Sequence, residues 1–260
     1  MSVARRIDRF LFAPVDAWSV GVFRVALVLV VALAFWEDRA LPGFLARTHW
    51  APGLWDAVFR TPAWWAACLL ALAAVGAGVG GRLGFVAAFG LLLPLAFARS
   101  AASRQILLTV WVCAGLLGAR PAQGALPIWP IRLVQLQLST VYAVNVWAKL
   151  TPEFLRGDVL VGLSRAMPNF RVDLSEGHLA LGPLAVPVWL CAVGTVAVEA
   201  ALAVGFWLPR LRWATAALGV TFHLGLKLVL TIGWLDWTCM LLYLAFLLPF
   251  ERPAPGADRR

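Results

Sequence analysis

Charged side chains are scarce in this sequence. Only 13% of its 260 residues are charged, whereas 62% are hydrophobic. A soluble globule of this length needs more polar surface than such a composition supplies. The composition therefore excludes an ordinary soluble domain and predicts a polytopic membrane protein.

The motifs of several enzyme classes are also missing. The sequence has no glycine-rich phosphate loop, no HExxH zinc motif and no GxSxG nucleophile motif. Its four cysteines form no CxxC pair and lie far apart inside apolar runs, at Cys68, Cys113, Cys191 and Cys239. Such cysteines favour buried free thiols over disulfides, and we expect no metal site.

The net charge of +9 does not indicate nucleic-acid binding. The basic residues are scattered over loops, and no basic helix face or aromatic-basic platform is present. Membrane lipid is the partner that this charge distribution favours.

Long apolar runs are abundant. A helix needs about 20 mostly apolar residues to cross the hydrocarbon layer. We predict an all-α transmembrane bundle of about eight spans within a membrane domain at 17–250, near 17–36, 63–80, 83–98, 104–119, 129–149, 186–208, 211–231 and 234–250. Very short joins near 80–82 and 99–104 leave seven spans as the alternative.

The basic residues also predict the orientation. Arg5, Arg6 and Arg9 precede the first span, whereas Glu37 and Asp38 follow it, so we expect residues 1–16 to be cytoplasmic. An even number of spans makes the tail at 251–260 cytoplasmic as well, in the cytoplasmic membrane of a prokaryote. The loop at 151–185 is then extracytoplasmic, and it is either a lid over a site or an ordinary solvated connection.

The span near 129–149 carries an unusual number of polar residues. They recur three or four positions apart, at Arg132, Gln135, Ser139, Tyr142, Asn145 and Lys149. At about 100° and 1.5 Å per residue they form one stripe roughly 26 Å long, which cannot face lipid. It faces either a polar pocket or polar groups on neighbouring helices. Lys149, at the helix end, either belongs to that pocket or extends to the interface.

Other spans supply possible partners. Arg24 lies in the first span, and its position within the apolar run also argues against a cleavable signal peptide. Glu199 lies midway along an apolar span, where a carboxyl group must be protonated or paired. His223 and Lys227 are four residues apart, on one face of their helix, and would repel each other if both were charged.

These stretches resemble a known family. They read "VFRVALVLVVALAFWEDRAL", "LQLSTVYAVNVWAKLTPEFLRGD", "VAVEAALAVGF" and "TFHLGLKLVL". Together and in this order they are similar to the HTTM domain, the transmembrane module shared with vitamin K-dependent gamma-carboxylases. The resemblance covers about residues 17–250.

The resemblance implies a chemistry. Lys149 would act as the base toward a reduced quinone of the vitamin K type, on the extracytoplasmic side, because a desolvated lysine offers a neutral amine. His223 would be a second polar group of the pocket, whereas Arg24 and Glu199 would be buried charges that hold helices or orient the site. The remaining candidates have no role implied by the resemblance and are selected only because they belong to the polar stripe: Tyr142, Asn145, Gln135 and Ser139.

Two departures from the family limit this expectation. The family usually carries an Asn and a His at the start of the fourth span, where this chain has Arg104 and Gln105. The chain also lacks the large lumenal domain that holds protein substrates in animal carboxylases, so gamma-carboxylation of proteins is not expected.

Two classes of function stay open. One is a membrane enzyme acting on a lipid quinone or on a small or peptide substrate. The other is a non-catalytic partner in the maturation or export of a secreted peptide, whose polar stripe is a binding groove. A transporter is a third reading, although no pair of broken helices in inverted repeats is visible.

Overall fold

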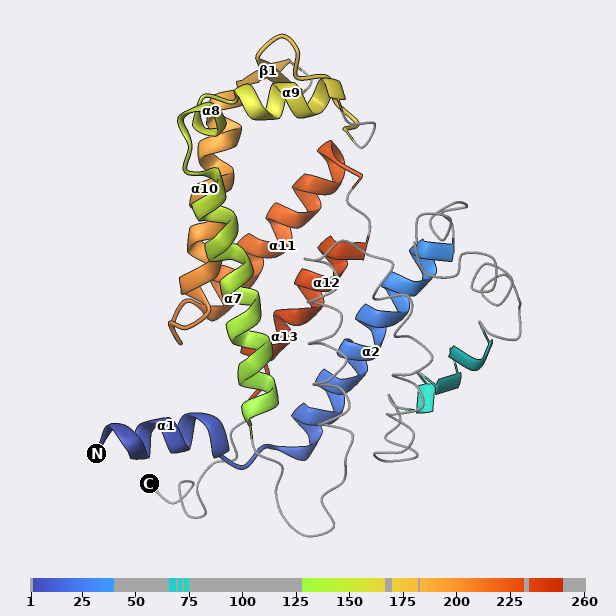
Figure 1. Ribbon diagram of the computed structural model, residues 1–260, viewed down its shortest axis with the longest axis vertical. Coiled ribbons are helices and arrows are strands. Elements are labelled where there is room, and N and C mark those ends of the chain that lie inside the picture. Colours follow the sequence, from blue (N-terminus) through green and yellow to red (C-terminus); the bar gives the residue numbers. More distant parts are fainter. Residues whose placement is uncertain are drawn as a thin grey trace, which may run out of the picture. The chain divides into compact units, whose positions relative to one another are not determined.

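A computed structural model of the chain describes residues 2–39, 66–68, 70–71, 73–74, 128–166, 170–181, 183–231 and 234–249. This part is mostly helical, which confirms the all-α prediction (Figure 1). The predicted spans near 83–98 and 104–119, most of the span near 63–80, and the tail at 251–260 lie outside the described residues. The chain divides into two compact units, Met1–Gln135 with Leu248–Arg260, and Leu136–Leu247.

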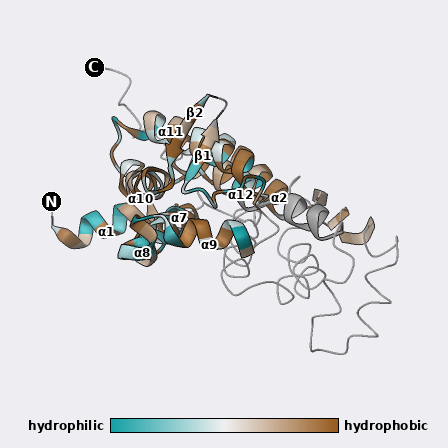
Figure 2. Ribbon diagram, turned by 90° about the horizontal axis from the view of Figure 1, so that it is seen from above, coloured by the Kyte–Doolittle hydropathy of each residue, from teal (hydrophilic) through white to brown (hydrophobic). Residues whose placement is uncertain are grey.

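The first unit begins with a helix that the sequence analysis did not predict. Helix α1 spans Val3–Phe12, and the Ser2 hydroxyl caps it by accepting a hydrogen bond from the backbone N–H of Arg5. Arg5, Arg6 and Arg9 alternate with exposed apolar residues, so both hydrophilic and hydrophobic colours appear along α1 in Figure 2. This amphipathic pattern is typical of helices that lie at a membrane surface.

Helix α2, Ala17–Arg39, contains the first predicted span. The Asp16 carboxylate accepts a hydrogen bond from the Ser19 backbone N–H at 2.8 Å and so caps the helix. The Ser19 hydroxyl donates to the Pro249 carbonyl at 3.1 Å, which joins the two ends of the chain within this unit. Phe23, Leu27 and Val30 recur at helical spacing and are fully buried.

The second unit contains the helices that matter most for function. Helix α7 has the predicted bounds, Trp129–Lys149, and its residues from Leu136 onward belong to this unit. The later long helices are α10 at Val188–Gly205, α11 at Arg212–Val229 and α12 at Trp234–Leu242, followed by the short α13 at Leu244–Leu247. Among the described helices, α10 alone is long and apolar enough to cross a membrane by length and composition. The count of eight spans stays a prediction.

Some predicted boundaries differ from the structure. Helix α10 begins at Val188 instead of residue 186, because residues 184–187 form a strand. It ends at Gly205 and is followed by turns that contain Pro209, which lacks a backbone donor. The last predicted span is interrupted at Tyr243, between α12 and α13.

The loop after α7 is largely structured. It forms α8 at Pro152–Leu155, α9 at Asp158–Ala166, and a hairpin of β1 at His178–Leu181 with β2 at Leu184–Pro187, in which His178 pairs with Pro187. Gly157, between α8 and α9, has φ +88°, and a Cβ there would lie 2.7 Å from a Val188 methyl group. Only glycine suits this turn without strain.

The loop is also held against the end of α11. Phe170 pairs with Leu230 in an isolated bridge, and the Arg171 backbone N–H donates to the Val229 carbonyl at 2.9 Å. Nearby, hydrogen bonds from the Ser175 backbone N–H and hydroxyl lower the pKa of the Asp173 carboxyl below its ordinary value. The loop is therefore more than a solvated connection.

Candidate functional site

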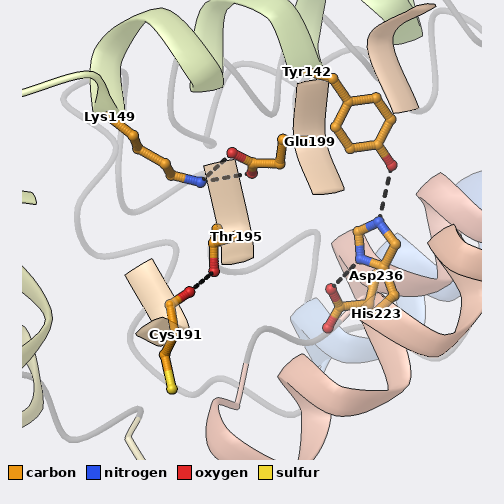
Figure 3. A network of polar contacts seen from close by, with 7 residues as sticks. All are labelled: Tyr142, Lys149, Cys191, Thr195, Glu199, His223 and Asp236. Carbon is orange, nitrogen blue, oxygen red and sulfur yellow. Dashed lines mark hydrogen bonds and ion pairs between the residues drawn. The ribbon is translucent and has the colours of Figure 1, made fainter. Parts of the chain in front are cut away.

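An ion pair joins two of the residues that the sequence analysis selected. The Lys149 Nζ donates to both carboxylate oxygens of Glu199, at 2.6 and 2.7 Å (Figure 3). The Lys149 side chain is 25% exposed and that of Glu199 is 5% exposed. Lys149 therefore points inward to a specific partner instead of extending to an interface.

Local helix geometry explains how this pair forms. Glu199 shares the buried face of α10 with Ala192, Val196 and Leu202, three or four residues apart. Phe154 of α8 packs on Ala192 and Val196, and its ring centre lies 5.8 Å from the Lys149 Nζ. Apolar groups thus line one side of the charged pair. Because they lower the local dielectric constant, they strengthen the attraction between the two charges.

A second polar cluster lies inside the same unit. The His223 Nδ1 is 2.9 Å from the Asp236 Oδ1, and its Nε2 is 2.9 Å from the Tyr142 hydroxyl oxygen. The Tyr142 hydroxyl also lies 2.7 Å from that of Tyr243. All four residues are buried, with exposures of 1 to 5%. Figure 3 shows Tyr142, His223 and Asp236 in one view with the Lys149 pair.

Lys227 belongs to this second cluster. Its Nζ lies 3.7 Å from the Asp236 Oδ2 and 4.7 Å from the centre of the Trp237 ring. The sequence analysis expected repulsion between His223 and Lys227. The structure places the Asp236 carboxylate against both side chains, which reduces that repulsion.

The polar stripe of α7 lies on the inner side of the helix. None of its six members is exposed, whereas Leu133, Leu136, Val144 and Trp147 on other faces are. Tyr142 and Lys149 are seven residues apart, so they share one face at a separation of about 10 Å along the axis. The stripe therefore links the two polar clusters.

The remaining candidates have separate positions. The Trp207 Nε1, in the turn after α10, donates to the Ser139 hydroxyl at 2.8 Å, so Ser139 bonds a neighbouring segment and does not line an open pocket at this point. Gln135 accepts from Arg132 at 2.9 Å in the first unit, and Asn145 is half-buried. Arg24 is half-buried on α2, in the first unit.

Sequence reasoning missed two residues of the second cluster, Asp236 and Tyr243. Both lie in the predicted span near 234–250. A carboxylate in the apolar stretch "GWLDWTCM" is the same signal that identified Glu199, but its place near a helix start favoured an ordinary first-turn acid. Nothing local in the sequence indicates that Tyr243 meets Tyr142.

Comparison with known proteins gives one result. A family model described as "HTTM domain" matches residues 89–249. The chain belongs to the HTTM family. This match confirms the family recognised in the sequence and relates the protein to the membrane-associated module of the carboxylases. It begins at residue 89 instead of about 17, so the fragment from the first span lies outside it. Neither the curated proteins nor the solved structures gave a match.

The chemical possibilities of the site follow from its residue types. Within the described residues, no group of three or more His, Cys, Asp or Glu side chains could hold a metal ion. The site instead offers an amine with a carboxylate at the end of α7, and an imidazole with two phenols deeper in the bundle. Both sets can accept or donate protons.

Proposed function

We propose that this HTTM protein is a membrane enzyme that performs acid-base chemistry on a reduced quinone, with the Lys149–Glu199 pair as its proton acceptor. The observation that carries the proposal is the bidentate contact of a partly exposed amine with a nearly buried carboxylate. A small molecule or peptide would be the final substrate.

The residues of the pair fit the hydroxyl group of a reduced quinone. Two N–H bonds of the Lys149 ammonium are directed at Glu199, which leaves the third for a ligand. The Phe154 ring supplies an apolar wall beside the amine. Lys149 and Glu199 would hold the hydroxyl and take its proton, and the quinone, once oxygenated by O2, would supply the basicity needed to remove a carbon-bound proton.

The ion pair is compatible with Lys149 as a base. Either Glu199 accepts the incoming proton directly, or Lys149 first passes a proton to Glu199 and then accepts one at Nζ. Both orders end with an ammonium group beside a neutral carboxyl group, so the pair has gained one proton. The ammonium group then stabilises negative charge on whatever lost the proton.

A charge-balanced double variant tests this proposal without leaving a buried charge unpaired. Lys149→Met with Glu199→Gln removes both ionisable groups at similar size, and such paired replacements are often neutral for stability. The assay measures consumption of reduced vitamin K, in air, by protein in lipid nanodiscs. We expect a loss of about 100-fold or more, the usual contribution of a general base.

The matched control is Arg156→Gln, which removes a 62% exposed cation from the nearby loop. It should leave turnover unchanged. If the double variant and Lys149→Arg both turn over like the parent protein, the pair is not a catalytic base, and the stripe of α7 functions as a binding groove.

We also propose that the end of α7 with Lys149 faces away from the cytoplasm. The basic residues before α2 and the acidic residues Glu37 and Asp38 in its last turn support this orientation, given the three spans predicted between α2 and α7. Glu176 is exposed in the loop, so Glu176→Cys should react with a membrane-impermeant maleimide in intact spheroplasts, against the parent protein as background. Labelling that occurs only after the membrane is broken would reverse the orientation.

A further inference from the structure

The second polar cluster forms one continuous chain of hydrogen bonds. It runs from Asp236 on α12 to His223 on α11, then to Tyr142 on α7, and ends at Tyr243 between α12 and α13, with spacings of 2.9, 2.9 and 2.7 Å. Every member is buried. The chain of hydrogen bonds thus connects α7, α11 and α12.

The chemistry of each group fixes the direction of this chain. A carboxylate only accepts, so the hydrogen between Asp236 and His223 resides on Nδ1. In a neutral imidazole Nε2 then accepts, and its donor must be the Tyr142 hydroxyl. Tyr142 has no second hydrogen, so it accepts from Tyr243. With a neutral imidazole, only this arrangement satisfies all three contacts.

We propose that Asp236 is a positioning residue that fixes His223 in the Nδ1–H tautomer and leaves Nε2 as a proton acceptor for Tyr142. A proton that enters at the Tyr243 hydroxyl is relayed along the chain: the Tyr243 O–H proton moves to Tyr142 as the Tyr142 O–H proton moves to Nε2, so both phenols stay neutral and the imidazole gains the proton. The resulting imidazolium is offset by the Asp236 carboxylate. The use of this group in catalysis rests on the proposed function, whereas the tautomer does not.

The burial of Asp236 favours a role in orienting His223 over a purely structural role as a hydrogen-bond partner between helices. A buried carboxylate is a costly way to make one hydrogen bond, because a neutral amide could make it without desolvating a charge. The Asp236 Oδ2 has no hydrogen-bond partner within the described residues. Lys227, 3.7 Å away, provides a neighbouring positive charge. A carboxylate held in this way orients the imidazole and stabilises its protonated form.

Nitrogen-15 NMR of the histidine ring tests the proposal directly. The chain has three histidines, and His49→Gln with His178→Gln leaves only His223. In lipid bilayers at neutral pH we expect a protonated Nδ1 and an unprotonated Nε2. The opposite pattern in this background would overturn the proposal, and that measurement needs no substitution within the cluster.

Asp236→Asn adds a second arm. The amide can donate to Nδ1, so we expect His223 to switch to the Nε2–H tautomer. The exposed Asp158→Asn is the matched control and should leave the spectrum unchanged. A spectrum for Asp236→Asn that equals the parent spectrum would contradict the positioning role.

Turnover of reduced vitamin K distinguishes this inference from the proposed function. We expect Asp236→Asn to lower turnover about 100-fold while quinone binding is retained. If the tautomer switches but the Lys149→Met, Glu199→Gln variant keeps full turnover, the proposed function fails and the positioning role stands. If that variant is inactive but the tautomer does not switch, only the present inference fails.

Discussion

The two polar clusters differ in exposure and in the kind of partner they use. The Lys149–Glu199 pair lies at the end of α7 and leaves its amine 25% exposed, whereas Asp236, His223, Tyr142 and Tyr243 are all almost completely buried. A ligand can reach the first cluster more easily than the second. We propose that the Lys149–Glu199 pair (the outer pair) meets the substrate and accepts its proton, whereas the four buried residues (the inner chain) hold a second proton acceptor, the His223 Nε2, away from solvent.

The largest expected effect is the loss of stability when only Lys149 is removed from its pair with Glu199. Lys149→Met leaves the nearly buried Glu199 carboxylate without its partner, and this should cost about 3 to 5 kcal/mol of stability at neutral pH. Adding Glu199→Gln should recover most of that loss, because no charge then remains. Thermal unfolding in detergent measures both. If Lys149→Met is as stable as the double variant, an unpaired Glu199 costs no stability, and the prediction is contradicted.

A steric change should disturb the inner chain without removing any of its members. A Cβ at Gly219 would lie 2.7 Å from ring atoms of Tyr243, so Gly219→Ala should displace the phenol from Tyr142 and cost about 1 to 3 kcal/mol. Gly225→Ala is the matched control on the same helix, since its added methyl group meets nothing within 4 Å. Similar unfolding temperatures for the two variants would contradict the tight contact.

A smaller effect is expected from removing one hydroxyl of the inner chain. Tyr243→Phe keeps the ring contact with Phe206, whose centre is 4.8 Å away, but removes the hydrogen bond to Tyr142. The expected loss is about 1 kcal/mol. Chemical unfolding measures it, and Tyr142→Phe should cost more because it interrupts two hydrogen bonds. The reverse order would mean that Tyr142 is not the central member.

The smallest effect should come from the loop outside both clusters. Arg156 and Asp158 are 3.0 Å apart, but their side chains are 62% and 59% exposed. Water and salt weaken such a pair, so Asp158→Asn should change stability by less than about 1 kcal/mol. Unfolding measured at low and high salt gives the value. If Asp158→Asn lowers the free energy of unfolding as much as Lys149→Met does, the exposed pair contributes as much stability as the buried one, which would contradict the comparison.

The sequence predicted best what depends on local pattern. The bounds of α7 and the inward position of its polar stripe follow from helical spacing, because polar groups avoid lipid. Lys149, Glu199 and His223 were identified because each interrupts an apolar run.

The pairings themselves could not be predicted, because they join residues on different elements, 13 positions apart for His223 and Asp236 and 50 to 101 positions apart for the other pairs. Spacing within one helix does not indicate which face of another helix it meets. Asp236 was therefore not linked to His223, and the break at Tyr243 was missed because the apolar run continues through it. The two short helices and the hairpin between residues 152 and 187 were not predicted, because the high polarity of this loop indicates irregular structure.

Infrared difference spectroscopy of the outer pair tests the central claim most directly. Addition of reduced vitamin K to the protein in nanodiscs should produce the C=O stretching band of a newly protonated carboxyl group, because the pair gains one proton. The band should be missing in Glu199→Gln and present in the Arg156→Gln control. No new band in the parent protein, or an equal band in Glu199→Gln, would contradict the account.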